Sequence, residues 1–238
     1  MTSTGTLPHH AVVIFSGGID STTAAFQLAV NGARLTLLSV NYGQQHQVEL
    51  RHAADLAAVL QAPHHVIDLR SLGTLLRGSA LTDDSVNVPD GHYTSSSMRS
   101  TVVPHRNALM LDLAVAVALG QGADAVVFGA HAGDHPIYPD CRPSFVTAYT
   151  EMVHVANEGF RPKGFQVLAP FLTRTKADIV RIGSGLGVPY ERTWSCYKGG
   201  DRHCGTCGTC VERREAFTLA EVPDPTRYTD ALPQAVAS

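Results

Sequence analysis

The segment Ser16-Gly17-Gly18-Ile19-Asp20-Ser21-Thr22 constrains the fold of this chain more than any other stretch of its sequence. It follows an apolar run over residues 11–15 and opens a helical pattern over residues 22–30. A buried strand that turns through Ser-Gly-Gly into a helix gathers backbone N–H groups at the positive end of the helix dipole. Glycine permits the dihedral angles that such a turn needs. The segment predicts a phosphate-binding loop, with an ordinary glycine-rich turn as the alternative.

The spacing within this loop separates it from the other common phosphate loop, which needs Lys and then Ser or Thr after its last glycine. Here Gly18 is followed by Ile-Asp-Ser. The Ser-Gly-Gly-x-Asp-Ser form resembles the pyrophosphate loop of ATP pyrophosphatases, enzymes that split ATP into AMP and pyrophosphate. The resemblance implies an ATP-binding segment made of Phe15, Ser16, Gly17, Gly18, Ile19, Asp20, Ser21, Thr22, Thr23, Ala24 and Ala25.

Strand-like and helix-like patterns alternate along the chain. Apolar runs of strand length cover residues 11–15, 34–42, 64–69 and 125–130. Helical patterns cover residues 22–30, 47–61, 107–120 and 176–186. Apolar strands separated by helices predict an α/β fold with a Rossmann-like open parallel sheet and helices on both faces. Ligands bind at the carboxyl ends of such strands, so residues 16–22, 41–45 and 131–142 are the candidate site segments.

Length and composition limit the molecule further. With 238 residues, 44% hydrophobic and 16% charged, the chain can bury a large core, and we expect one α/β domain over residues 1–222. The stretch from Pro223 to Ser238 contains three prolines and predicts a flexible tail. A net charge of −3 gives no general attraction to nucleic acid or membrane. The N-terminus lacks a secretory pattern, so we expect a cytoplasmic protein.

Residues 77–105 fit neither the strand nor the helix period. They are rich in Ser, Thr, Asp and Pro. A loop of this length in a compact domain is usually a functional cover or a disordered insertion. We favour a lid over the active site.

A cluster of cysteines is the second strong signal. Cys196, Cys204, Cys207 and Cys210 lie within fifteen residues, in a segment that we place at residues 194–212. Four thiolates suit tetrahedral Zn²⁺ without an open position, hence a structural site. An iron–sulfur cluster and unliganded cysteines are the alternatives. We expect His203 outside the ligand set and expect these basic residues to offset the charge of the thiolates: Lys198, Arg202, Arg213 and Arg214.

Other reactive side chains carry weaker signals. Cys141 is a possible nucleophile, but we prefer a small buried residue near a pocket. Histidines without shared spacing are usually structural or solvated, so we assign no catalysis to His46, His92, His105, His131 and His135.

Together the loop and the cysteine segment resemble the 7-cyano-7-deazaguanine synthase family, which makes the nitrile precursor of queuosine. The resemblance spans residues 11–218 in unchanged order. Its further motifs are Asn41-Tyr42-Gly43-Gln44-Gln45-His46 with Glu49-Leu50, Val103-Pro104-His105-Arg106-Asn107, Tyr138-Pro139-Asp140-Cys141-Arg142, Leu186-Gly187-Val188-Pro189 and Thr193-Trp194-Ser195-Cys196-Tyr197. The sequence departs from the family at residues 129–135, where many members have a Cys-Glu-Thr-Asp-like sequence and share only the acidic position.

The resemblance implies a reaction. Its substrates are 7-carboxy-7-deazaguanine, ammonia and ATP, with Mg²⁺ bridging the phosphates. Transfer of AMP to the carboxylate makes a leaving group, ammonia gives an amide, and a second adenylation gives the nitrile. The family also suggests a homodimer, and we expect no direct binding of nucleic acid.

Candidate roles follow for individual residues. We expect Asp20 to help place Mg²⁺, Lys176 to contact the leaving pyrophosphate, and Arg106 to neutralise charge at the transferring phosphate. Groups that can pair with the purine-like base or hold its carboxylate are Asn107, Asp134, Asp140 and Arg142. Helix capping, structural ion pairs and plain solvation are the alternative interpretations.

Three other functions are compatible with parts of the sequence. A tRNA thiolation enzyme shares the loop but needs a basic surface, which the net charge does not favour. A zinc module that binds nucleic acid leaves the phosphate loop unexplained. A relative in secondary metabolism, making a deazapurine nitrile or amide, is hardly separable by sequence.

Overall fold

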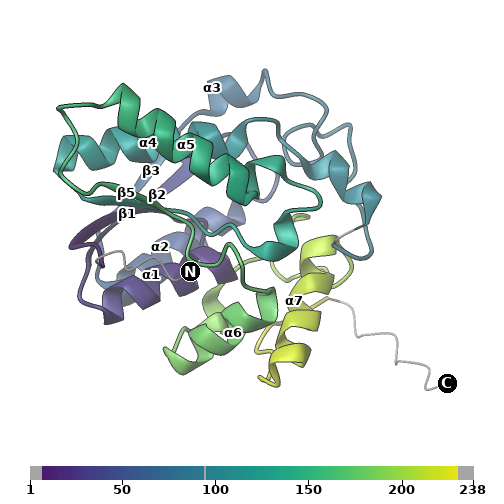
Figure 1. The fold of residues 1–238 in the computed structure, drawn as a ribbon. Helices are drawn as coiled ribbons and strands as arrows, with labels where there is room; N and C mark the ends of the chain where they lie inside the picture. The colour runs from purple at the N-terminus through teal and green to yellow at the C-terminus, as the bar shows by residue number, and fades with distance from the viewer. Residues whose placement is uncertain (1–6, 94, 230–238) are drawn as a thin grey trace.

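A five-stranded sheet forms the centre of the computed structural model, which describes residues 7–93 and 95–229. The strands are β1 (His10–Ile14), β2 (Arg34–Asn41), β3 (His64–Asp68), β4 (Ala125–Val127) and β5 (Gln166–Leu168). They are ordered β3-β2-β1-β4-β5, and each neighbouring pair is parallel (Figure 1). Val12 pairs with Thr36 on one side and Val126 on the other. The predicted open parallel sheet is confirmed.

Helices cover both faces of the sheet (Figure 1). One layer contains α1 (Ile19–Val30), α2 (Val48–Leu60), α6 (Lys176–Gly185) and α7 (Gly208–Ala220). The other contains α4 (Arg106–Gln121) and α5 (Pro143–Ala156). Alternation along β1 sends Ala11 and Val13 into the first layer and Val12 into the second, so both faces are buried. Each buried large side chain, such as Phe217, contributes about 1.5–3 kcal/mol.

Helix ends near the site are well defined. Thr175 caps α6 through a hydrogen bond to the N–H of Asp178, whose carboxylate accepts from the N–H of Thr175. The capped start holds Lys176 at the carboxyl edge of the sheet. At α1 the capping residue is Gly18, which has no side chain to satisfy the first N–H groups.

Among the α-helices and strands of the described residues, the sequence missed α3 (Arg70–Gly73), α5, β5 and α7. Strand β5 has three residues and begins with the polar Gln166, whereas the three residues of β4 lie within the longer apolar run over residues 125–130. Helix α7 begins inside the cysteine segment, whose spacing predicts metal ligands and hides a helical pattern.

Residues 77–105 pack on the cysteine segment in the part that the structure describes. They include the 3₁₀ helix η1 (Ser96–Thr101), and Met98 is buried. Asp90 forms an antiparallel bridge with Cys207, and the Gly91 N–H donates to the carbonyl of Thr206 at 3.0 Å. These contacts favour a cover over a disordered insertion.

Residues 223–229, at the start of the predicted flexible tail, also lie against the cysteine segment. Tyr228 forms a parallel bridge with His203, and the guanidinium carbon of Arg214 lies 3.8 Å from the centroid of the Tyr228 ring. Residues 230–238 lie outside the described residues. None of the helices within the described ranges combines the length and hydropathy needed to cross a membrane.

Candidate active site and metal centre

The predicted phosphate loop joins β1 to α1 and is held by its own serines. The Ser16 N–H donates to Ser21 Oγ, and the Gly18 N–H donates to Ser16 Oγ, both at 3.3 Å. Gly17 has a φ of +74°, and a Cβ there would lie 2.7 Å from the backbone nitrogen of Ala53. Only glycine therefore lets the loop approach α2 this closely. The uncapped N-terminus of α1 has the geometry of an anion site.

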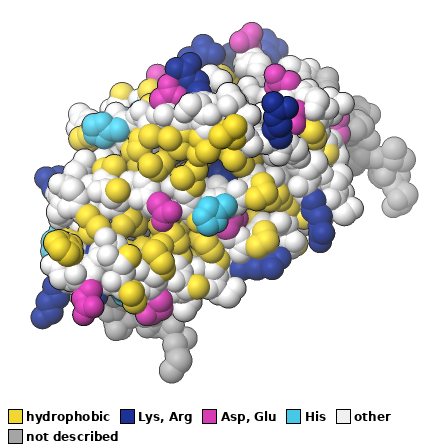
Figure 2. Space-filling model, turned by 90° about the horizontal axis from the view of Figure 1, so that it is seen from above, with side chains coloured by type: hydrophobic (Ala, Val, Ile, Leu, Met, Phe, Trp, Pro, Cys, Tyr) yellow, Lys and Arg dark blue, Asp and Glu magenta, His cyan; other side chains and the backbone are white. Residues whose placement is uncertain are grey.

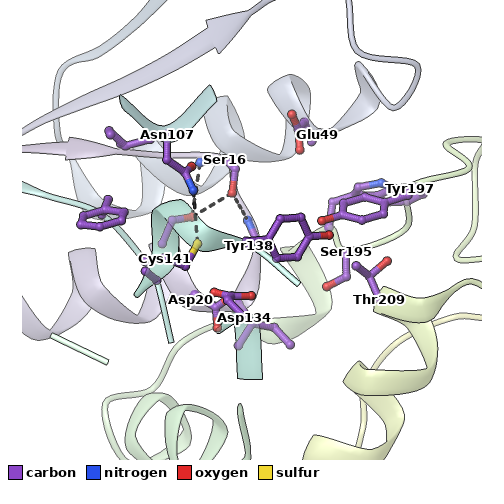
Figure 3. A pocket seen from close by; sticks show the side chains of 18 of the residues that line it. Ser16, Asp20, Glu49, Asn107, Asp134, Tyr138, Cys141, Ser195, Tyr197 and Thr209 are labelled. Atoms are coloured by element: carbon purple, nitrogen blue, oxygen red, sulfur yellow. Dashed lines mark hydrogen bonds between the residues drawn. The ribbon is translucent and has the colours of Figure 1, made fainter. Parts of the chain in front are cut away.

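A cavity of about 230 Å³ lies beside this loop. It sits between β1 and β4, where the strand order changes direction, the usual ligand position in such sheets. Its walls come from the ends of β1, β2 and β4, from the starts of α4 and α6, from α7 and from the cysteine segment (Figure 3).

Lys176 forms the charged centre of the cavity. Its Nζ lies 2.5 Å from Asp20 Oδ2 and 3.4 Å from Glu212 Oε2. Burial disfavours the ammonium, but the carboxylates of Asp20, Glu212 and Asp134 outweigh burial and raise the pKa of Lys176. The side chain is therefore a fixed positive charge at the phosphate loop.

One carboxylate oxygen of Asp20 is available to bind a cation. Its Oδ1 is buried and has no hydrogen-bond partner among the described residues. An unpaired carboxylate oxygen beside a phosphate loop is the donor type that Mg²⁺ prefers. Asp20 thus fits a divalent cation chemically.

Asp134 ends the 3₁₀ helix η2 (Ala132–Asp134) and faces the cavity. Its Oδ1 accepts a 3.0 Å hydrogen bond from the Tyr93 hydroxyl, and its Oδ2 accepts from the N–H of His131 at 3.0 Å. Tyr93 belongs to residues 77–105, so this segment contributes directly to the cavity wall.

Arg106 begins α4 and lies among tyrosines. It shares a hydrogen bond with the Tyr42 hydroxyl. The hydroxyls of Tyr138 and Tyr197 share another and lie close together in Figure 3. Asn107 Nδ2 donates to Cys141 Sγ at 3.2 Å (Figure 3). The cavity thus offers aromatic faces and a guanidinium, a suitable lining for a flat, anionic ligand.

Cys141 is 5% exposed, and burial raises the pKa of its thiol. Geometry and charge favour the small buried residue over the nucleophile.

The structure brings many of the predicted site residues together. From the loop, Ser16, Gly18, Ile19, Asp20 and Ser21 line the cavity, as do Arg106, Asn107, Asp134 and Lys176. Buried behind the loop are Phe15, Thr22, Thr23, Ala24 and Ala25.

Asp140 and Arg142 do not line the cavity. Both lie in or beside the 3₁₀ helix η3 (Pro139–Cys141). Asp140 Oδ2 accepts from the N–H of Asn107 at 3.1 Å, and Arg142 Nε donates to the carbonyl of His135 at 2.9 Å. In this arrangement Asp140 holds the start of α4, and Arg142 closes a turn.

Glu212 is a cavity residue that the sequence did not reveal. It lies two residues after Cys210, on α7. The helical phase of α7 would have been the signal, because it points Thr209 and Glu212 into the cavity and Cys210 toward the other cysteines.

The four cysteines of the second motif converge on one point. Their sulfur atoms all lie within 4.8 Å of one another, and the sulfurs of Cys204 and Cys210 are 3.8 Å apart. Backbone N–H groups of Cys204, Thr206 and Cys207 donate to these sulfurs. A tetrahedron of about 2.3 Å bonds has edges of about 3.8 Å, so the four residues fit a single metal ion.

The predicted charge-balancing residues contact other groups. Lys198 Nζ lies 2.6 Å from Asp90, and the Arg213 guanidinium donates to Thr193, Ser195 and the carbonyl of Tyr190. His203 Nε2 accepts from the N–H of Ser195 at 3.1 Å. Arg213 and His203 therefore fix the chain between the cysteine segment and α7.

Comparison with known proteins agrees with the motifs. The family model described as "Queuosine biosynthesis protein QueC" matches residues 10–221. The chain belongs to the QueC family. Curated QueC relatives from Brucella ovis and Brucella canis are each 54% identical over 220 residues, which cover 92% of this chain and 94% of the relative. Both are named 7-cyano-7-deazaguanine synthase. The predicted family is confirmed.

Two solved structures are more distantly similar to this QueC chain. NMN synthetase from Francisella tularensis is 16% identical with a TM-score of 0.48, over 95% of this chain and 90% of that one. A 4-thiouridine synthetase in complex with RNA and ATP is 19% identical with a TM-score of 0.49, over 90% of this chain and 52% of that one.

Proposed function

We propose that the cavity converts 7-carboxy-7-deazaguanine, ammonia and ATP to 7-cyano-7-deazaguanine, AMP and pyrophosphate. One observation carries the proposal: the N-terminus of α1, the Lys176–Asp20 pair and the tyrosine-lined Arg106 share a single cavity. Membership of the QueC family and the names of the curated relatives support it.

Two adenylations account for the chemistry. The substrate carboxylate oxygen attacks the α-phosphorus of ATP, and the bond to the bridging oxygen breaks to release pyrophosphate. Ammonia then attacks the acyl carbon, AMP leaves, and one proton passes to water. The amide oxygen attacks a second ATP, again releasing pyrophosphate and one proton. Loss of AMP and of the last N–H proton forms the nitrile.

Different residues of the cavity bind the phosphates, neutralise charge at the reacting groups and bind the deazaguanine ring. The α1 N–H groups and Lys176 hold the phosphates that leave as pyrophosphate, which needs the positive charge that the surrounding carboxylates maintain on Lys176. Arg106 neutralises charge where the carboxylate and the α-phosphate meet. Asn107 and Asp134 face the space for the deazaguanine ring and present hydrogen-bonding groups to its edge.

Two metal ions belong to the proposal. Asp20 would hold Mg²⁺, which when bound neutralises phosphate charge. Cys196, Cys204, Cys207 and Cys210 would hold a structural Zn²⁺. An iron–sulfur cluster places its four thiolates at the outer corners of a cube, farther apart than a single ion does, so the close sulfurs favour zinc.

We also propose a domain organisation, a cellular location and an oligomeric state for the protein. Residues 1–222 act as a single domain, because α7 and the cysteine segment complete the cavity. Unbridged metal-binding thiols favour the cytoplasm. Apolar side chains gather on the face that carries α4 and α5 (Figure 2). On α5, Val155 is 75% exposed, and this surface supports a homodimer.

Mass spectrometry with ATP, Mg²⁺, ammonium and 7-carboxy-7-deazaguanine tests the reaction. We expect the nitrile mass, with AMP formed only in the presence of the deazaguanine. Lys176→Met should lower the rate by a factor of about 100 or more, because one preorganised charge is lost. The matched control is Lys163→Met, at an exposed position outside the cavity. Absence of AMP from folded, metal-loaded protein would refute the proposal.

A further inference from the structure

Glu212 faces the cavity and shares its ion-pair partner Lys176 with Asp20. Its side chain is 13% exposed, and within the described residues its oxygens receive no hydrogen bond. Oε2 lies 3.4 Å from Lys176 Nζ, and Oε1 lies 3.7 Å from His131 Nε2. Lys176 is already paired more closely with Asp20, at 2.5 Å. Glu212 is thus a cavity carboxylate without a cation of its own.

His131 is buried behind the cavity and points into this cluster. The side chain is 1% exposed. Its Nδ1 accepts a 3.0 Å hydrogen bond from the N–H of Gly133, so the ring proton is on Nε2. Nε2 lies between Asp134 Oδ1, at 3.3 Å, and Glu212 Oε1, and has no properly oriented hydrogen-bond partner in the described chain. The ring therefore holds Asp134 and Glu212 near each other without neutralising either.

The charges of this cluster do not balance. Asp20, Asp134 and Glu212 supply three carboxylates, while Lys176 supplies one ammonium. Burial opposes the charged form of Glu212 and raises its pKa, although Lys176 acts in the opposite direction. A small cation bound between Asp134 and Glu212 would relieve this imbalance.

We propose that Asp134 and Glu212, held by His131, bind the nitrogen donor as an ammonium ion. This inference rests on the proposed function, because it names the site of one substrate of that reaction. Ammonium suits the pair better than Mg²⁺. The oxygens of Asp134 already accept from Tyr93 O–H and His131 N–H, which leaves lone pairs for single hydrogen bonds but crowds an octahedral shell.

The position also suits the reaction. Glu212 contacts Lys176, and Lys176 contacts Asp20 of the phosphate loop. An ammonium ion bound at Glu212 would therefore lie in the same cavity as the adenylated carboxylate. It passes one proton to the Glu212 carboxylate, and the ammonia that forms attacks the acyl carbon as AMP leaves.

Glu212→Gln tests the proposal because it removes the charge and keeps the shape. Two reactions are measured: nitrile formation as a function of ammonium, and ATP–pyrophosphate exchange with 7-carboxy-7-deazaguanine in the absence of ammonium. We expect the KM for ammonium to rise about tenfold or more. The exchange rate should stay within about twofold, because Lys176 keeps its closer partner Asp20, which contributes most to holding the ammonium charged. Glu215→Gln, an exposed position on the same helix outside the cavity, is the control and should change neither.

Hydroxylamine provides an independent readout, since it is an uncharged nucleophile at neutral pH. Its capture of the adenylated carboxylate should be the same in Glu212→Gln and in the unmodified protein. An equal loss with both nucleophiles would mean that Glu212 acts on a shared step. Loss of exchange with an unchanged KM for ammonium would mean that Glu212 acts by supporting the charge of Lys176. A higher Mg²⁺ concentration needed for activity would mean that Glu212 is a metal ligand. Each of these results would overturn the proposal.

Gly133→Ala provides a second variant outside the pair itself. A Cβ at this position would lie 2.7 Å from His131 Cε1 and 3.2 Å from Glu212 Oε1, so the ring must shift and its contact with Glu212 is disturbed. We expect the same selective rise in the KM for ammonium, and an unchanged KM would contradict the role of His131. If the unmodified protein shows no exchange, the proposed function itself fails. Failure of the ammonium site alone leaves exchange in the unmodified protein intact.

Discussion

His10 shows how a single buried ring can make stability depend on pH. It starts β1, at the end of the sheet opposite the cavity, and is 7% exposed. Arg34 Nη2 donates to its Nδ1 at 2.8 Å, and Nε2 lies 3.0 Å from Thr36 Oγ1. Since Arg34 can only donate, the ring is neutral with its proton on Nε2. Burial, and then the charge of Arg34, lower the pKa of His10.

The sign of the effect follows from linkage. Below about pH 6.5 the unfolded chain protonates this histidine while the folded protein does not, so stability falls as the pH is lowered. At pH 5 the loss from His10 reaches at most about 2 kcal/mol. In His10→Gln, urea unfolding at pH 7.5 and pH 5 should show a smaller difference between the two pH values. An unchanged difference would mean that His10 binds a proton in the folded state.

Single residues of the site differed in how well the sequence predicted them. Asp20 and Lys176 lie directly after strand ends or at helix starts, so the topology brings them together, and they pair as adjacent charges. Arg142 is different because a short turn decides whether its side chain enters the cavity. Its Nε satisfies a backbone carbonyl instead. No local sequence pattern predicts whether the Arg142 side chain enters the cavity or bonds a backbone carbonyl.

Helix α6 packs closely on α1 through glycine. A methyl group at Gly183 would overlap the Tyr190 hydroxyl, which hydrogen-bonds Thr23 Oγ1 at 3.0 Å, and would lie 2.8 Å from that oxygen. Gly183→Ala should therefore lower the free energy of unfolding by about 2 kcal/mol, through overpacking and a lost hydrogen bond. Thermal or urea unfolding measures this loss.

The same helix offers its own control at Gly185. A Cβ at this position meets no atom within 4 Å. Gly185→Ala should be neutral or stabilising by up to about 1 kcal/mol, because alanine favours the helix. Equal effects of the two substitutions would show that α6 does not pack on α1 as described.

Elements with a full period or a long apolar run were predicted closely, whereas short elements without such a run and the helix that overlaps the cysteine segment were not. The predicted helix over residues 47–61 is α2 (Val48–Leu60), and the predicted strand over residues 34–42 is β2 (Arg34–Asn41). Strand β5 depends on pairing with β4 rather than on its own three residues. The first turn of helix α7 contains the metal-ligand candidate Cys210, so the cysteine spacing obscures the helical spacing of the apolar residues.

The four-cysteine centre joins parts of the molecule that are far apart in sequence. It anchors the start of α7, and its neighbours contact residues 77–105 and 223–229. Cys210→Ser should abolish stoichiometric zinc, lower the unfolding temperature by several degrees or more, and reduce nitrile formation, because metal binding contributes folding free energy and α7 carries Glu212. Metal analysis, calorimetry and the nitrile assay measure these effects.

Cys141→Ser is the matched control for this prediction. Cys141 is buried beside the cavity but lies outside the group of four converging sulfurs. It should keep its zinc and most of its thermal stability. Full zinc binding by Cys210→Ser would contradict the assignment of the ligands.

The order in which the cavity walls occur along the chain has a consequence for protein synthesis. The phosphate loop leaves the ribosome early, whereas Lys176 and Glu212 follow long after it. A nascent chain can thus form β1, β2 and the loop while the charged centre does not yet exist. Chains that stop before α7 should therefore not consume ATP, because they lack part of the charged centre.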